Sequence, residues 1–115
     1  PCQKNMDVSS GAEVIAYAVK NGITFIDTAE YYDTYRYISE AYPLLTEEER
    51  KSIVISTKSY ADTYQDMMKA IDDALKALDR EYIDIFLMHE VRSSQFDERK
   101  DAWKALNDAK KIGKA

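Results

Sequence analysis

The sequence predicts an α/β fold in which short buried strands run parallel and are separated by helices. Three apolar runs rich in β-branched or aromatic residues favour strands, at 23–26, at 53–55 within a wider segment 52–57, and at 82–88. Longer segments around them carry apolar residues at helical spacing. Parallel strands need a crossover of a dozen or more residues, so this alternation is typical of βα units. The expected order is αβαβαβα.

The first helix is expected over about 11–21, because signals mark both of its ends. Ser10, followed three residues later by Glu13, matches a capping box, in which two side chains bond the free amides of the first turn. Gly22 stands where helices commonly end with a left-handed residue. This helix should lead directly into the first strand.

Three further helices are expected over about 33–49, 62–78 and 98–112. In the first of these Pro43 should break or restart the helix, because proline removes a backbone donor and clashes with the preceding turn. The second has an apolar stripe typical of a core-facing helix. That stripe consists of Met67, Met68, Ile71, Ala74, Leu75 and Leu78. The inward side of the third should carry Trp103, Leu106 and Ala109.

Composition limits the class of protein. The chain has 115 residues, of which 45% are hydrophobic and 32% charged, and this is typical of one soluble globular domain. Its net charge of −5 is spread along the chain, so no basic patch for nucleic acid is present in the sequence. The longest apolar run, 85–88, is far shorter than the roughly 20 residues that cross a bilayer. Cys2 is the only cysteine, which excludes an internal disulfide, leaves too few thiols for a zinc or iron-sulfur site and fits the cytoplasm.

The small number of glycines helps to distinguish between the possible folds with parallel strands. Open sheets and barrels are both compatible with the alternation. With only three glycines, at 11, 22 and 113, no glycine-rich phosphate loop can follow any strand. This counts against dinucleotide-binding open sheets and P-loop folds, and favours the barrel by elimination.

Each strand delivers one titratable residue at its carboxyl end: Asp27, Lys58 and His89. In parallel α/β folds these ends lie side by side at one rim, where active sites are assembled. Each residue alone also fits a structural role, as a helix cap, a solvated loop lysine or a buried histidine. Three such residues at one rim, with Tyr32 close behind Asp27, favour catalysis.

Three segments resemble the aldo-keto reductase family. Residues 22–32, G-I-T-F-I-D-T-A-E-Y-Y, match the family pattern G-x-x-x-x-D-T-A-x-x-Y at every fixed position. Residues 54–58 and 82–89 resemble the family's third and fourth strands. The resemblance implies a (β/α)₈ TIM barrel, present here as a partial barrel of about three parallel strands and four helices. We expect residues 1–115 to form a single domain that is incomplete at both ends.

The resemblance also implies the site residues. Asp27, Tyr32, Lys58 and His89 correspond to the family's catalytic tetrad, and 56–60 and 89–91 should border the substrate mouth. Asp27 would also contact the cofactor, whose other contacts lie outside this sequence, and no metal is expected.

Two features of the tyrosine segment qualify that assignment. The family commonly has glycine after its catalytic tyrosine, whereas Asp33 stands here, which affects the loop and not the tetrad. Tyr31 is the neighbouring tyrosine that the structure must exclude, because spacing alone selects Tyr32.

The implied function is reduction of an aldehyde or ketone to an alcohol, with hydride from NADPH or NADH. Tyr32 would act as general acid, Lys58 would stabilise its phenolate, Asp27 would hold Lys58, and His89 would orient a small-molecule carbonyl substrate. Two alternatives stay open at this point. One is a regulatory or binding protein on the same scaffold, and the other is an inactive fragment that self-associates through exposed sheet edges.

Overall fold

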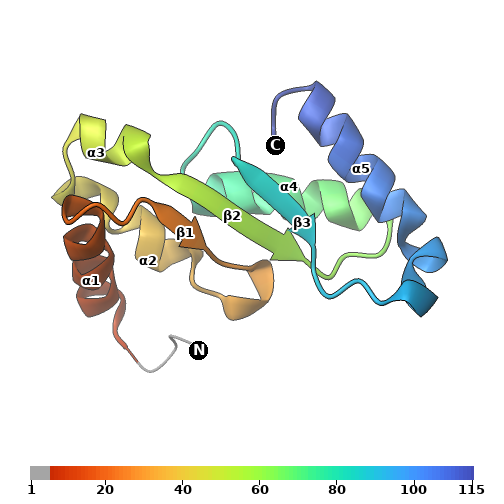
Figure 1. The fold of residues 1–115 in the computed structure, drawn as a ribbon, viewed down its shortest axis with the longest axis horizontal. Helices are drawn as coiled ribbons and strands as arrows, with labels where there is room; N and C mark the ends of the chain where they lie inside the picture. Colours follow the sequence, from red (N-terminus) through yellow and green to blue (C-terminus); the bar gives the residue numbers. More distant parts are fainter. Residues whose placement is uncertain (1–5) are drawn as a thin grey trace.

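Residues 6–115 are described by a computed structural model, in which three parallel strands form one sheet (Figure 1). The strands are β1 (Phe25–Asp27), β2 (Val54–Ser59) and β3 (Ile85–Met88), and β2 lies in the middle. The three predicted strands and their parallel pairing are therefore confirmed. Strand β2 continues two residues beyond the predicted segment, and this places Lys58 within the sheet. Cys2 lies outside the described residues.

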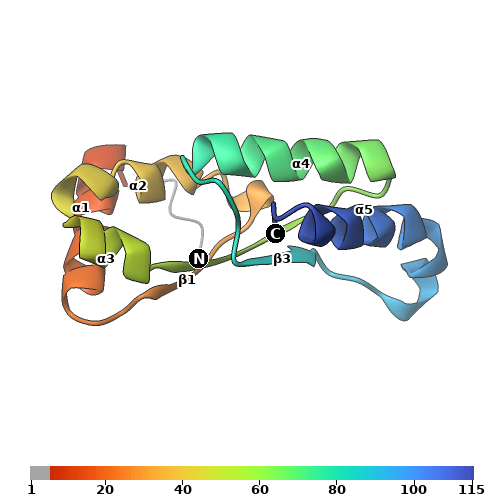
Figure 2. The same cartoon turned by 90° about the horizontal axis from the view of Figure 1, so that it is seen from above.

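The helices lie at the start of the strands and on one face of the sheet, as Figure 2 shows. They are α1 (Val8–Lys20), α2 (Tyr35–Ser39), α3 (Glu47–Ser52), α4 (Tyr64–Ala77) and α5 (Lys100–Lys111). Short 3-10 turns occupy Glu30–Tyr32, Tyr42–Leu44, Ser93–Gln95 and Asp97–Arg99. Among residues 6–115, no helix covers the opposite face of the sheet.

Helix α1 begins earlier than the sequence predicts. Asp7 is its N-cap, and the Asp7 carboxylate accepts a hydrogen bond of 2.9 Å from the Ser10 amide. Ser10 therefore lies inside the first turn, and the expected capping box with Glu13 is wrong. An aspartate is as good a cap as a serine, so the earlier residue captures the helix end. At the other end Gly22 adopts φ +94°, which confirms the left-handed position.

The helix predicted over 33–49 is divided into separate pieces. Pro43 lies in the 3-10 turn between α2 and α3, where the expected break occurs. Helix α3 has a capping box of its own, because Thr46 and Glu49 bond each other's backbone amides at 3.2 and 2.9 Å. Two short helices therefore stand between β1 and β2, where the sequence predicts one.

The core lies between the sheet and the helices that cover it. In the stripe of the helix predicted over 62–78, four members are completely buried and two, Met68 and Leu75, are partly buried against the core, so this helix faces inward as predicted. The completely buried members are Met67, Ile71, Ala74 and Leu78. On α5 Leu106 and Ala109 are buried, but the expected inward place of Trp103 is wrong, because half of that side chain is exposed. The inward face of α5 is formed by Ala102, Ala105, Leu106 and Ala109. Small residues there allow α5 to pack closely on α4.

Only one face of the sheet is buried by the described helices, whereas the sequence predicts buried strands. Phe25, Ile85 and Leu87 are exposed on the face of the sheet that no described helix covers. Side chains alternate along a strand, so Asp27 shares a face with Phe25, and Lys58 pairs in register with Leu87. The two charged residues therefore project from the open face of the sheet.

Candidate active site

The four residues predicted as catalytic meet at the carboxyl ends of the strands. Asp27 is the last residue of β1, Lys58 lies one residue before the end of β2, and His89 directly follows β3. Tyr32 ends the 3-10 turn that follows β1. The structure brings all four together, because the parallel strands end at a common rim.

Lys58 is the centre of the group. Its ammonium donates to Asp27 Oδ2 and to the carbonyl of Thr28, both at 2.9 Å. The Lys58 side chain is 15% exposed, whereas that of Asp27 is 56% exposed. Lys58 Nζ also lies 5.2 Å from the centre of the Tyr32 ring. A largely buried ammonium is thus held by one carboxylate and placed beside one tyrosine.

The turn that carries Tyr32 is fixed by buried hydroxyl groups. Thr28 and Thr34, which flank the turn, share a hydrogen bond of 2.9 Å between their hydroxyls. Tyr35 continues the connection, because its hydroxyl lies 2.7 Å from that of Thr57 on β2. Burial raises the pKa of Tyr35 to about 12, so this tyrosine stays protonated as part of the framework.

His89 is enclosed by aromatic rings and is 7% exposed. Its imidazole meets the Tyr32 ring edge to face at 6.0 Å between centres, and stacks on the Tyr60 ring at 3.9 Å with 12° between the planes. Burial, and then the Lys58 charge, lower the pKa of His89 from 6.5. Its Nδ1 is buried and has no hydrogen-bond partner among the described residues. His89 is therefore neutral near pH 7.

The geometry separates Tyr32 from the neighbouring tyrosines. Tyr31 is 71% exposed and touches the Tyr60 ring by its edge, with 5.6 Å between the ring centres. Tyr60 lies beside His89, but burial and the nearby Glu90 raise its pKa, which makes it a poorer acid. Of these three, Tyr32 is the tyrosine that has ring contacts with both Lys58 and His89.

Sequence reasoning placed Tyr60 only at the border of a substrate mouth and gave it no contact with His89. The sequence does contain a signal for this contact. Tyr60, two positions beyond Lys58, directly follows β2, and His89 directly follows β3, so the two residues lie next to each other at the ends of paired strands. Arg99 carried no signal at all. This arginine lies ten residues beyond His89, at the start of α5, and reaches back to the strand ends.

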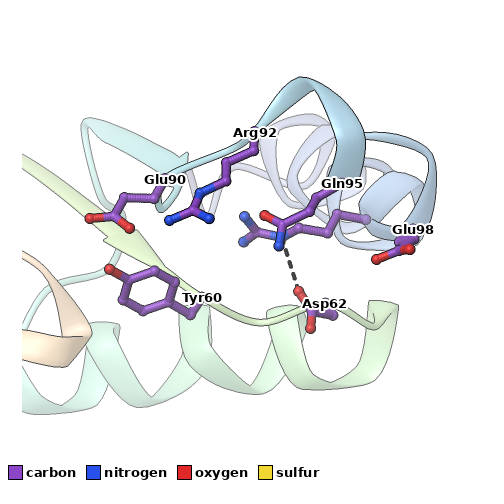
Figure 3. Close-up of a pocket in the computed structure, with 7 residues that line it drawn as sticks. Tyr60, Asp62, Glu90, Arg92, Gln95 and Glu98 are labelled. Carbon is purple, nitrogen blue, oxygen red and sulfur yellow. Dashed lines mark ion pairs between the residues drawn. The ribbon is translucent and has the colours of Figure 1, made fainter.

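A cavity of about 350 Å³ adjoins Tyr60 on the side of α5 (Figure 3). Figure 3 shows Tyr60, Glu90 and Arg92 at one end of it, and Asp62, Gln95 and Glu98 toward the other. Its wall carries charges of both signs. The cavity is therefore polar and lies next to the tyrosine that stacks on His89.

Neither a metal site nor a membrane span is found in residues 6–115. No group of three or more His, Cys, Asp or Glu residues there is arranged to hold a metal ion. No helix of this part is long and apolar enough to cross a bilayer.

A family model described as "Aldo/keto reductase family" matches residues 3–115. Among curated proteins, the NADPH-dependent alpha-keto amide reductase of Saccharomyces cerevisiae is 35% identical over 119 residues, covering 93% of this chain and 36% of that protein. Methylglyoxal reductase DkgA of Escherichia coli is 32% identical over 108 residues, covering 91% of this chain and 38% of that protein. The chain thus spans less than two fifths of the length of these relatives.

Solved structures share the fold. An aldo-keto reductase from a Medee basin deep-sea metagenome library superposes with a TM-score of 0.81 at 23% identity, over 95% of this chain and 39% of that one. The Bombyx mori aldo-keto reductase AKR2E4, crystallised in complex with NADP, gives a TM-score of 0.77 at 23% identity, over 98% of this chain and 40% of that one. The three described strands thus correspond to part of a (β/α) barrel.

Proposed function

Since the chain belongs to the aldo/keto reductase family, we propose that the protein carrying it reduces a small aldehyde or ketone to an alcohol with NADPH. The relatives named as alpha-keto amide and methylglyoxal reductases support substrates in which the reacting carbonyl adjoins a second one. The observation that carries the proposal is the position of Lys58, between the Asp27 carboxylate and the Tyr32 ring.

Tyr32 is the proton donor in this proposal. Hydride addition to a carbonyl carbon develops negative charge on oxygen, which needs a proton and electrostatic support. The Tyr32 hydroxyl would donate that proton and leave a phenolate. An ammonium about 4 Å from such a charge stabilises it by roughly 4 kcal/mol at an effective dielectric of about 20. Lys58, whose ammonium lies 5.2 Å from the centre of the Tyr32 ring, would supply this charge.

Asp27 and Thr28 act through Lys58. The carboxylate of Asp27 would disfavour a phenolate by its own charge, so its useful role is to keep the buried ammonium protonated and in place. The carbonyl of Thr28 supplies the second acceptor at 2.9 Å. Together these two contacts hold the Lys58 ammonium at the rim of the sheet.

His89 orients the substrate. A neutral imidazole can donate one hydrogen bond to the carbonyl oxygen, and its lowered pKa keeps it neutral near pH 7. The stacked Tyr60 ring restricts rotation of the imidazole and shields one of its faces from water. His89 and Tyr32 would thus approach the same oxygen from adjoining rings.

The residues present fit a nicotinamide cofactor beside this group. The Asp27 carboxylate is more than half exposed on the open sheet face, where it can accept hydrogen bonds from hydroxyl or amide groups. The bound cofactor would supply the hydride, and Asp27 is the described residue that would contact it.

The test is NADPH oxidation by the protein that carries this chain, with methylglyoxal as substrate. We expect turnover that Lys58→Met lowers by about 100-fold or more, because the phenolate loses its cation. Lys69→Met is the matched control, since Lys69 is exposed on α4 and forms a surface ion pair with Asp73. Failure of the unmodified protein to oxidise NADPH with any carbonyl compound would contradict the proposal.

Three further expectations accompany this function. We propose a cytoplasmic location, supported by the single cysteine of the sequence, which fits a reducing compartment. We propose that the protein does not bind nucleic acid, on the basis of its net charge of −5. We also propose that the 115-residue chain self-associates through the edges of its sheet, because β1 and β3 each have one unpaired side in the sheet that residues 6–115 form.

A further inference from the structure

Arg99, at the start of α5, is a buried cation that contacts the carboxyl ends of β2 and β3. It is 4% exposed, and one guanidinium nitrogen donates to the carbonyl of His89 at 2.8 Å. The other terminal nitrogen donates to the carbonyls of Ser59 and Ala61, at 3.3 and 3.4 Å. The dashed line to Asp62 in Figure 3 marks its ion pair, at 3.0 Å between Nε and Oδ1.

These acceptors are the backbone groups that place His89 and Tyr60. Ser59 ends β2, and its carbonyl also accepts the His89 amide at 2.9 Å, so Arg99 binds both partners of the last interstrand contact. Tyr60 lies between Ser59 and Ala61, whose carbonyls Arg99 holds on either side of it. The stacking of Tyr60 on His89 thus depends on backbone that one side chain fixes.

The backbone at this point is strained. Glu90 adopts φ +49°, a left-handed conformation that is unfavourable for residues with a side chain. Arg99 binds the carbonyl of His89, which belongs to the peptide bond between His89 and Glu90. The guanidinium therefore holds the backbone directly before the strained residue. Loss of this bond would remove one constraint on the backbone next to the His89 imidazole.

We propose that Arg99 is a positioning residue, which holds His89 and the stacked Tyr60 in the geometry needed for carbonyl reduction. This inference rests on the proposed function. Arginine suits the role because its planar fork of donors reaches several acceptors at once, whereas a lysine offers a single ammonium. The Asp62 carboxylate is 71% exposed, so the ion pair is the least protected of these contacts.

The experiment measures kcat, KM and the NMR signals of the His89 imidazole in the protein that carries this chain. His89→Gln assigns the signals, and NADPH oxidation gives the rates. We expect Arg99→Met to lower kcat by about 10- to 100-fold, because a small displacement of a catalytic group has an effect of this size. KM should stay within about threefold of its original value if ground-state binding is retained.

The imidazole signals separate positioning from general stability. The groups that face His89 are Lys58, Asp27, Glu90, Arg99 and the rings of Tyr32 and Tyr60. Burial and the Lys58 and Arg99 charges lower the pKa of His89, so Arg99→Met should raise its titration midpoint. Arg99→Lys keeps the charge but loses the fork, and should shift the imidazole signals with a smaller change in midpoint and a partial return of kcat.

Two matched variants complete the design. Asp62→Asn removes the ion pair but leaves the three carbonyl contacts, and should lower kcat much less than Arg99→Met does, because the Asp62 carboxylate is 71% exposed. Arg92→Met removes another arginine from the same cavity and should leave kcat and the His89 signals unchanged.

If the Arg99→Met protein does not fold, Arg99→Lys supplies the measurement that decides whether Arg99 positions His89. Unshifted His89 signals and an unchanged kcat in a folded Arg99→Lys or Arg99→Met protein would overturn the proposal. An equal loss of kcat in Asp62→Asn would overturn it as well. If the unmodified protein reduces no carbonyl, the proposed function fails, and the His89 signals still show whether Arg99 positions this residue.

Discussion

Asp33 and Glu90 directly follow Tyr32 and His89, and both adopt left-handed backbone, at φ +55° and +49°. Asp33 stands where the related family commonly has glycine. Aspartate is among the few residues with a side chain that tolerate this conformation. The departure from the family pattern therefore preserves the turn that places Tyr32 beside Lys58.

His89 makes stability depend on pH. Burial and the Lys58 charge lower its pKa from 6.5, so the unfolded chain takes up a proton before the folded chain does. The contribution of neutral His89 is fully present above pH 6.5 and is lost as pH falls through its lower folded value. We expect the unfolding free energy of the 115-residue chain to fall across this range, measured by urea denaturation at a series of pH values.

His89→Gln is the control for this pH effect. The variant should lack the fall just below pH 6.5, and should keep the loss at lower pH where Asp7 and Glu49, whose pKa values are lowered by hydrogen bonds, become protonated. Identical pH profiles for the two proteins would show that His89 is not buried as described.

At the residue scale, the residues at the ends of the strands could be predicted from the sequence, but the contacts of side chains with distant parts of the chain could not. Asp27, Lys58 and His89 follow from apolar runs that end in a charged or polar residue, and Tyr32 followed from a family pattern. Arg99 could not be predicted, because its hydrogen-bond acceptors are backbone carbonyls, which leave no trace in the sequence, and its ion-pair partner Asp62 lies far from it along the chain. Tyr60 looked like a border residue, because stacking depends on two strands ending at the same level.

At the scale of elements, local signals competed with one another. Asp7 and Ser10 both suit the start of α1, and the sequence alone does not say which of these two nearby residues is the cap. Thr46 likewise suits a helix start. Trp103 was expected inward as a large apolar residue, but α5 packs on α4 through alanines, which permit a closer approach. The periodicity of the helix predicted over 62–78 was the stronger signal, and this helix faces inward as predicted.

Strand β3 provides a prediction at this scale. Its outer edge has no partner strand in the described sheet, and Leu87 is exposed on its open face. We expect the 115-residue chain to self-associate at micromolar concentration, and Leu87→Lys to shift it toward the monomer, because a charge on an edge strand opposes pairing. Sedimentation velocity measures the distribution of the two species.

Trp103→Lys is the matched variant for that prediction, because Trp103 is equally exposed but lies on α5. It should leave the association unchanged. If Trp103→Lys and not Leu87→Lys produces the monomer, the helical surface, and not the sheet, is responsible.

At the scale of the molecule, the proposed proton-transfer group lies at the rim of an open sheet, where the three parallel strands end. The alternation of strands and helices, with few glycines, was sufficient to favour a barrel, and the family match and solved structures agree. Burial on both faces could not be inferred for these strands, because it depends on a layer that residues 6–115 do not contain. The chain spans 36% of the yeast relative, so the activity of the whole protein is a proposal that the enzyme assays must test.

The most direct test of the account compares Tyr32→Phe with Tyr31→Phe in the protein that carries this chain. We expect Tyr32→Phe to lower kcat for carbonyl reduction by about 100-fold or more, because the general acid is lost, while NADPH affinity measured by fluorescence changes little. Tyr31→Phe should retain near-normal turnover, since Tyr31 contacts the ring of Tyr60 and is largely exposed. Full turnover in Tyr32→Phe, or its loss in Tyr31→Phe, would contradict the assignment of Tyr32 as the proton donor.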